Sequence, residues 1–182
     1  EITSEARRMV SEDSRMSNAR TTVLFQQGWH KGVIGIVASR LIETYYRPTV
    51  ILTESKDGFA TGSARSVPGY DLYQAIESCS DLLESFGGHM FAAGLTLKQE
   101  NLPQFRERFE KFVSETIKDE HLVPSVNIDG EIPLEEVTMD LYNNLGRFQP
   151  FGPENTAPVF ASRRVKTLAC QPVGSNGMHL KL

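Results

Sequence analysis

Short apolar runs alternate with longer runs of helical periodicity between residues 20 and 120, and this alternation constrains the fold more than any other feature. The run "TTVLFQQ" predicts a buried strand, "GVIGIVASRLIETYY" a helix that ends before Arg47-Pro48, and "TVILTE" a second buried strand. Further strands are predicted at 59–65 and 92–98, and further helices at 71–86 and 101–117. Strands that alternate with helices indicate an α/β domain of about a hundred residues.

The helix predicted at 71–86 has boundary signals at both ends. Asp71 and Gln74 have the spacing of a capping pair at its start. Gly87 stands where a helix often ends in a left-handed residue. We therefore expect the segment "GGHMFAAG" to begin at a helix terminus and to lead into the strand at 92–98.

Different patterns precede and follow this domain. Residues 1–19 predict a helix with a thin apolar stripe that needs a partner. Residues 121–182 predict a small, mostly-β module with a short helix around Leu141 and Leu145, and with strands at 126–132, 159–169 and 178–182. Because the chain begins with Glu1 and ends on an open strand pattern, we expect it to be a piece of a longer protein.

The composition excludes several classes of protein. With 40% hydrophobic and 23% charged residues, the chain has the composition of a folded soluble domain and not of a disordered one. No apolar run is long enough to span a membrane. Cys79 and Cys170 have neither zinc-site nor redox spacing, so we expect a cytoplasmic protein with no membrane partner. The net charge of −4 provides no general attraction to nucleic acid, so any such binding must be local.

Two short motifs offer phosphate-binding chemistry. In "GWHKGVIGI", His30 and Lys31 precede a helix, whose N-terminal N–H groups attract anions. The alternative is a turn with a packed Trp29 and a solvated lysine. In "GSARS", Ser63 and Arg65 combine a hydroxyl with a guanidinium, which suits a phosphate group. The alternative is an ordinary surface arginine.

The third motif is "GGHMFAAG". Gly87 and Gly88 would leave backbone N–H groups uncovered, and His89 would donate a hydrogen bond to a phosphate oxygen or to a bridging water. The alternative is a helix terminus followed by a histidine that is hydrogen-bonded in the core.

The fourth motif, "RFQPFGPENTAPVF", places aromatic residues among prolines and glycines. Phe151 in the motif, with Arg163 and Arg164 after it, could stack bases and follow a nucleic-acid backbone. The alternative is that the aromatic residues fix a rigid loop onto a small barrel.

These four motifs, in this order and at these intervals, resemble the RecJ family of single-stranded-DNA-specific exonucleases, which belongs to the DHH phosphoesterase superfamily. The resemblance covers nearly the whole chain. It implies an α/β fold class: the tail of a connecting helix (1–19), a DHH-associated domain with a mixed sheet flanked by helices (20–120), and part of an OB-like nucleic-acid-binding β module (121–182).

The resemblance also implies a function. The family hydrolyses single-stranded DNA from 5′ to 3′ in DNA repair and recombination, and uses Mn²⁺ or Mg²⁺ held by an N-terminal DHH domain. This sequence has no Asp-His-His, and its histidines have no neighbouring set of aspartates. We therefore expect the chain to bind no metal and to be inactive alone. The implied partners are single-stranded DNA, the family's own DHH domain and a single-strand-binding protein.

The resemblance assigns roles to the motif residues. His89, as the catalytic residue, holds the scissile phosphate together with Gly87 and Gly88. The other implied phosphate-binding residues are Ser63, Arg65, His30 and Lys31, and the candidate DNA contacts in the OB-like module are Phe151, Arg163 and Arg164. Two alternatives stay open: a DHH-family phosphoesterase that acts on short oligonucleotides, and a nucleic-acid-binding module without catalytic function.

Overall fold

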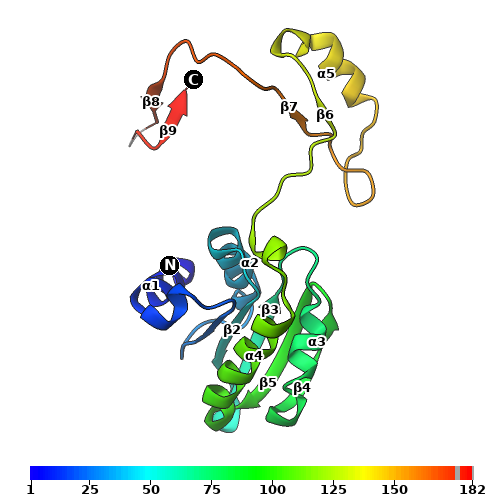
Figure 1. The fold of residues 1–182 in the computed structure, drawn as a ribbon. Helices are drawn as coiled ribbons and strands as arrows, with labels where there is room; N and C mark the ends of the chain where they lie inside the picture. The colour runs from blue at the N-terminus through cyan, green and yellow to red at the C-terminus, as the bar shows by residue number, and fades with distance from the viewer. Residues whose placement is uncertain (175–176, 182) are drawn as a thin grey trace. The chain divides into compact units, whose positions relative to one another are not determined.

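The computed structural model describes residues 1–174 and 177–181 and is drawn in Figure 1. The chain divides into two compact units, Glu1–Pro124 (unit 1) and Ser125–Leu182 (unit 2). Each unit has its own secondary structure and is described by itself.

Unit 1 is built on a five-stranded mixed sheet with the strand order β1-β2-β3-β5-β4. The first two strands, β1 (Thr22–Phe25) and β2 (Thr49–Glu54), are parallel and are joined through helix α2 (Ile34–Tyr45). The other neighbours are antiparallel: β3 (Phe59–Arg65) pairs with β2 and with β5 (Ala92–Lys98), and β4 (Leu83–His89) pairs with β5 at the sheet edge. The expected mixed sheet flanked by helices is thus confirmed.

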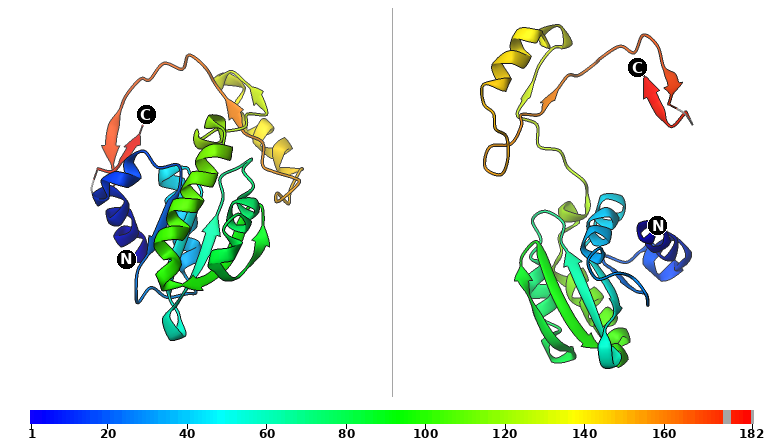
Figure 2. Two further views of the ribbon diagram at one scale, coloured as in Figure 1. Left: turned by 60° about the horizontal axis from the view of Figure 1, so that its bottom comes forward. Right: turned by 180° about the vertical axis from the view of Figure 1, so that it is seen from behind.

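Helices pack on both faces of this sheet, and on the second face they leave part of the sheet open. Helices α3 (Leu72–Glu77) and α4 (Leu102–Thr116) pack on the first face, where Phe105 and Phe109 are fully buried. On the second face, α2 packs over β2 and β3, and its Val37 and Leu41 share a buried cluster with Ile51 of β2. The right-hand view of Figure 2 shows β4 and β5 without a covering helix on this second side.

We call the part of the second face that α2 leaves exposed or half-exposed the open face. Its positions follow from the strand register, because residues directly opposite each other in a β ladder point to the same side of the sheet. They are Thr61, Ser63 and Arg65 on β3, Ala92, Gly94 and Thr96 on β5, and Ser85, Gly87 and His89 on β4.

The apolar stripe near the N-terminus has its partner within unit 1. Helix α1 (Ile2–Glu12) buries Ala6 and Val10 in the cluster that α2 forms. Glu5 accepts a hydrogen bond of 2.8 Å from the indole Nε1 of Trp29, which is itself buried. Helix α1 is shorter than the expected 1–19, since a 3-10 turn follows at Ser14–Ser17.

The helix predicted at 71–86 is wrong in its second half. Asp71 does cap α3, because its carboxylate accepts hydrogen bonds from the N–H groups of Tyr73 and Gln74. The helix ends at Glu77, however, and residues 83–89 form strand β4. Ser78 donates its hydroxyl to the Ala75 carbonyl, which competes with continuation of the helix. Gly87 is consequently a strand residue and not a helix terminator.

Unit 2 contains less regular structure than the sequence predicts. Helix α5 (Met139–Gly146) is present as expected. The strands are short: β6 (Gly130–Glu131) pairs with β7 (Phe160–Ala161), and β8 (Gln171–Val173), which the sequence analysis missed, pairs with β9 (His179–Lys181). Residue 182 of the strand predicted at 178–182 lies outside the described residues.

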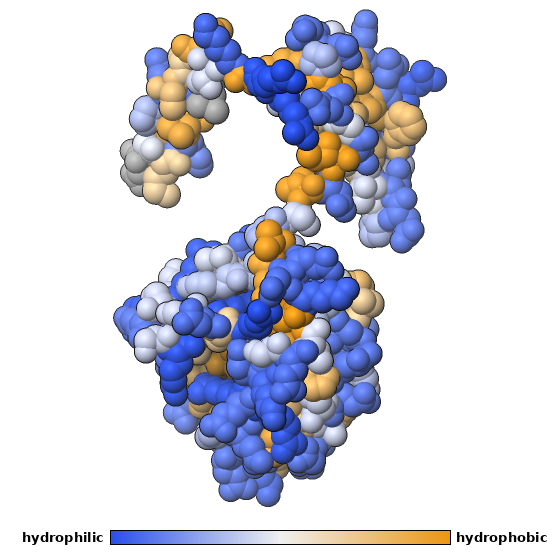
Figure 3. Space-filling model, in the orientation of Figure 1, coloured by the Kyte–Doolittle hydropathy of each residue, from blue (hydrophilic) through white to orange (hydrophobic). Residues whose placement is uncertain are grey.

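Two-stranded sheets cannot bury an apolar face on their own. No described residue of unit 2 is fully buried, and large apolar side chains such as Leu168, Met178 and Tyr142 are exposed. Figure 3 shows hydrophobic surface on this unit.

Candidate nucleic-acid interface

The strand register brings four of the predicted site residues together on the open face. His89 lies opposite Ala92, and Ala92 lies opposite Arg65. In the next row, Gly87 lies opposite Gly94, and Gly94 lies opposite Ser63. Two motifs that are more than twenty positions apart in the sequence therefore line one side of three adjacent strands.

Arg65 is held in place by its neighbours and by α2. Its Nη1 donates to the Ser63 hydroxyl and to the Ala64 carbonyl, both at 2.8 Å. A Cβ atom at Gly35 of α2 would lie only 2.7 Å from Arg65 Nη2 and 3.1 Å from the Ser63 hydroxyl oxygen. Gly35 thus allows the guanidinium to lie against the first turn of the helix, where backbone N–H groups are free to attract an anion.

His89 is an exposed residue at the end of β4, so it is not a core histidine. Its Nδ1 accepts a hydrogen bond of 3.2 Å from the backbone N–H of Phe91. An imidazole nitrogen that accepts a hydrogen bond carries no proton, so the proton of the neutral ring is on Nε2. The Phe91 backbone therefore fixes the tautomer in which Nε2 is a donor, which is the form needed to bind a phosphate oxygen.

The two glycines of the motif have different roles. Gly88 has φ = 151°, and a Cβ there would overlap the Ala92 carbonyl oxygen and lie 2.6 Å from Ala93 Cα. Gly88 is thus required by the close pairing of β4 with β5. A Cβ at Gly87 would meet nothing within 4 Å, and one at Gly94 would meet only the Gly62 carbonyl oxygen at 3.9 Å. The fold needs no glycine at these two positions, which form a flat floor between His89 and Ser63.

His30 and Lys31 lie in the exposed turn before α2, five and four residues ahead of Gly35. His30 Nδ1 accepts from the Gly32 N–H at 3.1 Å, and Lys31 Nζ donates to the Ser55 hydroxyl at 2.8 Å. The second bond holds Lys31 near the end of β2, whereas the His30 bond lies within the turn itself. They do not link either residue to Arg65 or His89.

The predicted DNA contacts of unit 2 lie on its surface. Asn155 fixes the loop that contains half-buried Phe151, because its Nδ2 donates to the Phe148 and Pro150 carbonyls at 2.9 Å. Arg163 forms an ion pair with Glu131 at 2.8 Å. Arg164 is exposed with φ = 55°. The hydrogen bonds of Asn155 support the interpretation that Phe151 belongs to a rigid loop. The charge of Arg163 is partly neutralised by the Glu131 carboxylate.

Nothing on the open face fits a divalent cation. Hard cations such as Mg²⁺ need several oxygen ligands, mostly carboxylates, and no open-face position carries one. Across the described residues, no group of three or more His, Cys, Asp or Glu side chains could hold a metal. Also within the described part of the chain, no helix is long and apolar enough to cross a membrane.

Sequence reasoning missed three contributors to this face. The role of Gly35 could have been suspected from the sequence, because a glycine inside a helical pattern usually allows another group to pack closely against the helix. Gly94 is the last residue of the motif "GGHMFAAG", but its place opposite Gly87 depends on strand pairing, which the local sequence does not show. Phe91 was part of a quoted motif, but no local pattern shows that its N–H orients His89.

The comparisons with known proteins agree with this architecture. Residues 18–115 match the DHHA1 domain model and residues 128–182 match the RecJ OB domain model. The single-stranded-DNA-specific exonuclease RecJ of Bacillus subtilis is 34% identical over 182 residues, which is 100% of this chain and 23% of that protein. RecJ of Thermus thermophilus is 30% identical over 145 residues, 78% of this chain and 20% of that protein.

The solved structures give the same result. The crystal structure of Thermus thermophilus RecJ in complex with Mn²⁺ superposes with a TM-score of 0.74 at 28% identity, and covers 87% of this chain and 23% of that one. The chain therefore spans between 20% and 30% of the length of the RecJ relatives it matches. The expected resemblance is confirmed, and so is the expected order of a DHH-associated domain followed by an OB-like module. Since the DHHA1 match covers more than half of its 182 residues and the RecJ OB match follows, this chain belongs to the DHHA1 domain family, in the domain arrangement of the RecJ exonucleases.

Proposed function

We propose that the open face binds the phosphate backbone of single-stranded DNA, and that the chain is the substrate-binding part of a 5′-to-3′ single-stranded-DNA exonuclease. One observation carries the proposal: the register places His89, Arg65 and Ser63 around a floor of glycines that the fold itself does not require. The relatives named above are single-stranded-DNA-specific exonucleases, which supports the choice of substrate.

The donors of this face suit two neighbouring phosphates. Arg65 keeps Nη2 and Nε for a ligand while Nη1 bonds to its own strand. His89 offers Nε2–H from the other side of β5. Adjacent strands are about 4.8 Å apart, so the backbones of these residues are separated by about 10 Å across β5. Side chains that reach inward from both ends can hold consecutive phosphates of one strand above the glycine floor.

We propose that the metal ions of the complete enzyme are Mn²⁺ or Mg²⁺, held by a DHH domain that is not part of this chain. The relatives from Thermus thermophilus were crystallised with these two ions. Such ions would polarise the phosphate and activate a water molecule. The residues of this chain would position the phosphate from the opposite side, with His89 and Arg65 as fixed donors.

The remaining assignments are proposals of the same kind. We propose that His30 and Lys31 extend the DNA path towards the end of β2, and that Phe151, Arg163 and Arg164 contact DNA in unit 2. The match to the RecJ OB domain favours an enzyme that acts on long single strands over one that acts on short oligonucleotides. A role in DNA repair and recombination, a cytoplasmic location and contact with single-strand-binding protein complete the proposal.

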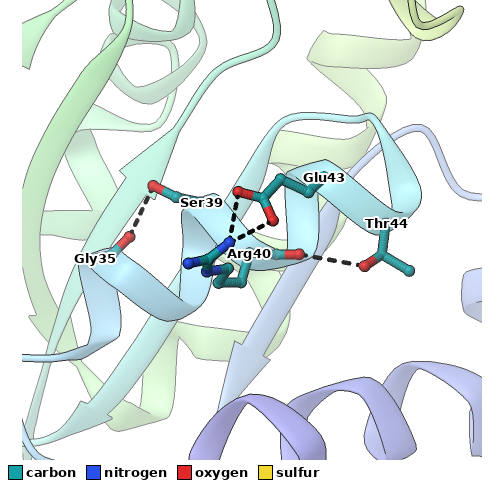
Figure 4. Close-up of polar contacts among 5 residues, drawn as sticks. All are labelled: Gly35, Ser39, Arg40, Glu43 and Thr44. Atoms are coloured by element: carbon teal, nitrogen blue, oxygen red, sulfur yellow. Dashed lines mark hydrogen bonds and ion pairs between the residues drawn. The ribbon is translucent and has the colours of Figure 1, made fainter. Parts of the chain in front are cut away.

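The test is a titration of the chain with a 5′-phosphorylated oligothymidylate, followed by fluorescence anisotropy at several salt concentrations. We expect Arg65→Ala and His89→Ala each to weaken binding, and Arg65→Ala to reduce its salt dependence as well, since it removes a cationic phosphate contact. Arg40→Ala is the matched control. Arg40 is an exposed residue of α2 and pairs with Glu43 at 3.0 and 3.2 Å (Figure 4). Equal effects of Arg40→Ala and Arg65→Ala would exclude a specific site on the open face.

A further inference from the structure

Phe91 is the only exposed Phe, Tyr or Trp residue of unit 1, all of whose residues the structure describes. Its side chain is 53% exposed, and the neighbouring Met90 is 40% exposed. The other aromatic side chains of the unit are buried or half-buried. The exposed Phe91 ring lies at the end of β4, next to His89 of the open face.

Both residues of the turn that carries Phe91, Met90 and Phe91 itself, are held by backbone hydrogen bonds. The Phe91 carbonyl accepts from the Ser66 N–H at 3.0 Å, and the Met90 carbonyl accepts from the Leu72 N–H at 3.1 Å. The Phe91 N–H donates to His89 Nδ1. Because the backbone is fixed at three points, binding a flat ligand against the ring would cost little further conformational entropy.

The ring also lies beside the donor that is proposed to hold phosphate. The centroids of the Phe91 and His89 rings are 5.9 Å apart, and the rings meet edge to face at 68°. A phosphate bound at His89 Nε2 therefore has an aromatic ring close to it. In a nucleotide, the distance between the base and its own phosphate is similar to the distance between these two rings. One nucleotide can therefore contact both side chains.

We propose that Phe91 is a stacking platform for the nucleobase of the nucleotide whose phosphate His89 binds. This inference rests on the proposed function and adds the element that selects single strands. Any base can stack on a phenyl ring, so the contact is independent of sequence. In a duplex the bases are already stacked and paired, and none is free to leave its neighbours for Phe91.

The experiment uses NMR titration of the isotope-labelled chain with two small ligands, because weak binding is measurable by this method. The first ligand is the 5′-phosphorylated dinucleotide pdTpdT, and the second is the same molecule with an abasic sugar in place of one thymidine, made at each position in turn. With the wild-type chain, we expect the protons of one thymine to shift upfield, as they do above an aromatic ring. The variants are Phe91→Ala and Phe91→Tyr, with Val123→Ala as a control at an equally exposed apolar residue (60%).

We expect Phe91→Ala to weaken pdTpdT binding by about 5- to 150-fold, and to leave unchanged the affinity for the ligand that lacks the stacked base. Phe91→Tyr and Val123→Ala should bind like the wild type. An absence of upfield shifts with the wild-type chain, or an equal loss of affinity for both ligands in Phe91→Ala, would overturn the stacking role while phosphate binding at His89 stands. If neither ligand perturbs the His89 resonances at millimolar concentration, the proposed function fails and this inference fails with it.

Discussion

Substitutions at the adjacent residues Gly87 and Gly88 should separate effects on folding from effects on DNA binding most clearly. Both are replaced by alanine, one at a time, so that the same methyl group is added at neighbouring positions of β4. At Gly88 the added Cβ overlaps the backbone of β5, whereas at Gly87 it projects into free space above the open face. The first variant should therefore unfold more easily, and the second should lose DNA binding.

The magnitude at Gly88 follows from two costs. A non-glycine residue at φ near 151° costs about 1–3 kcal/mol in backbone strain. The overlap is with the Ala92 carbonyl and with Ala93 Cα at 2.6 Å, so β4 must move away from β5 and lose ladder hydrogen bonds worth about 1 kcal/mol each. A total of about 3–5 kcal/mol in a 124-residue unit lowers its Tm by about 10–20 °C. Gly87→Ala has neither cost and should melt within about 3 °C of the wild type.

Thermal unfolding followed by circular dichroism measures the first effect, and the oligothymidylate titration measures the second. We expect Gly87→Ala to bind DNA at least about tenfold more weakly, because its methyl group separates the phosphate backbone from the floor. If Gly88→Ala melts like the wild type, the close pairing at the end of β4 is wrong. Unchanged binding by a well-folded Gly87→Ala variant would show that DNA does not approach the glycine floor.

Four further outcomes follow from the geometry. Arg65→Lys should weaken DNA binding in the anisotropy titration by about tenfold, because the lysine ammonium lacks the planar fork with which Arg65 can bond to its own strand and present two further donors to a phosphate. Glu110→Ala should lower the free energy of unfolding in urea by about 2–4 kcal/mol, since two backbone N–H groups and the Thr21 hydroxyl lose their acceptor. Burial raises the pKa of the Cys79 thiol, so a thiol reagent at pH 8 should modify exposed Cys170 in the native chain and Cys79 only after unfolding, as mass spectrometry can show. Chromatography of DNA incubated with the chain and Mn²⁺ should detect no released nucleotides, because the described residues contain no metal-binding group.

Most of unit 1 was predictable because its signals are local. The strands β1, β2, β3 and β5 and the helices α2 and α4 fall within one or two residues of the predicted ranges. Their burial patterns are continuous or strictly periodic, and each is bounded by a turn residue or a proline. Even the Asp57-Gly58 turn has the two positive φ angles that such a hairpin needs.

The elements of unit 2 that failed depend on how short strands pair with each other. The pairs β6 with β7 and β8 with β9 are short and involve residues that the sequence pattern alone does not bring together. Their extent is set by register and not by the alternation of apolar residues, so the long strands predicted at 126–132 and 159–169 were wrong.

Residues 83–89 form a strand and not the end of a helix, and this difference decides which residues face the binding site. A helix terminus would present the N–H groups of Gly87 and Gly88 together, as one anion-binding corner. In a strand, alternate residues face opposite sides, so Gly87 and His89 share the open face and Gly88 faces the core side. The same period of two on β3 puts Ser63 and Arg65 on that face and Ala64 in the core. The binding surface thus arises from strand periodicity repeated on both sides of β5. A one-residue slip of β4 would turn His89 away from Arg65, and the close fit at Gly88 opposes such a slip.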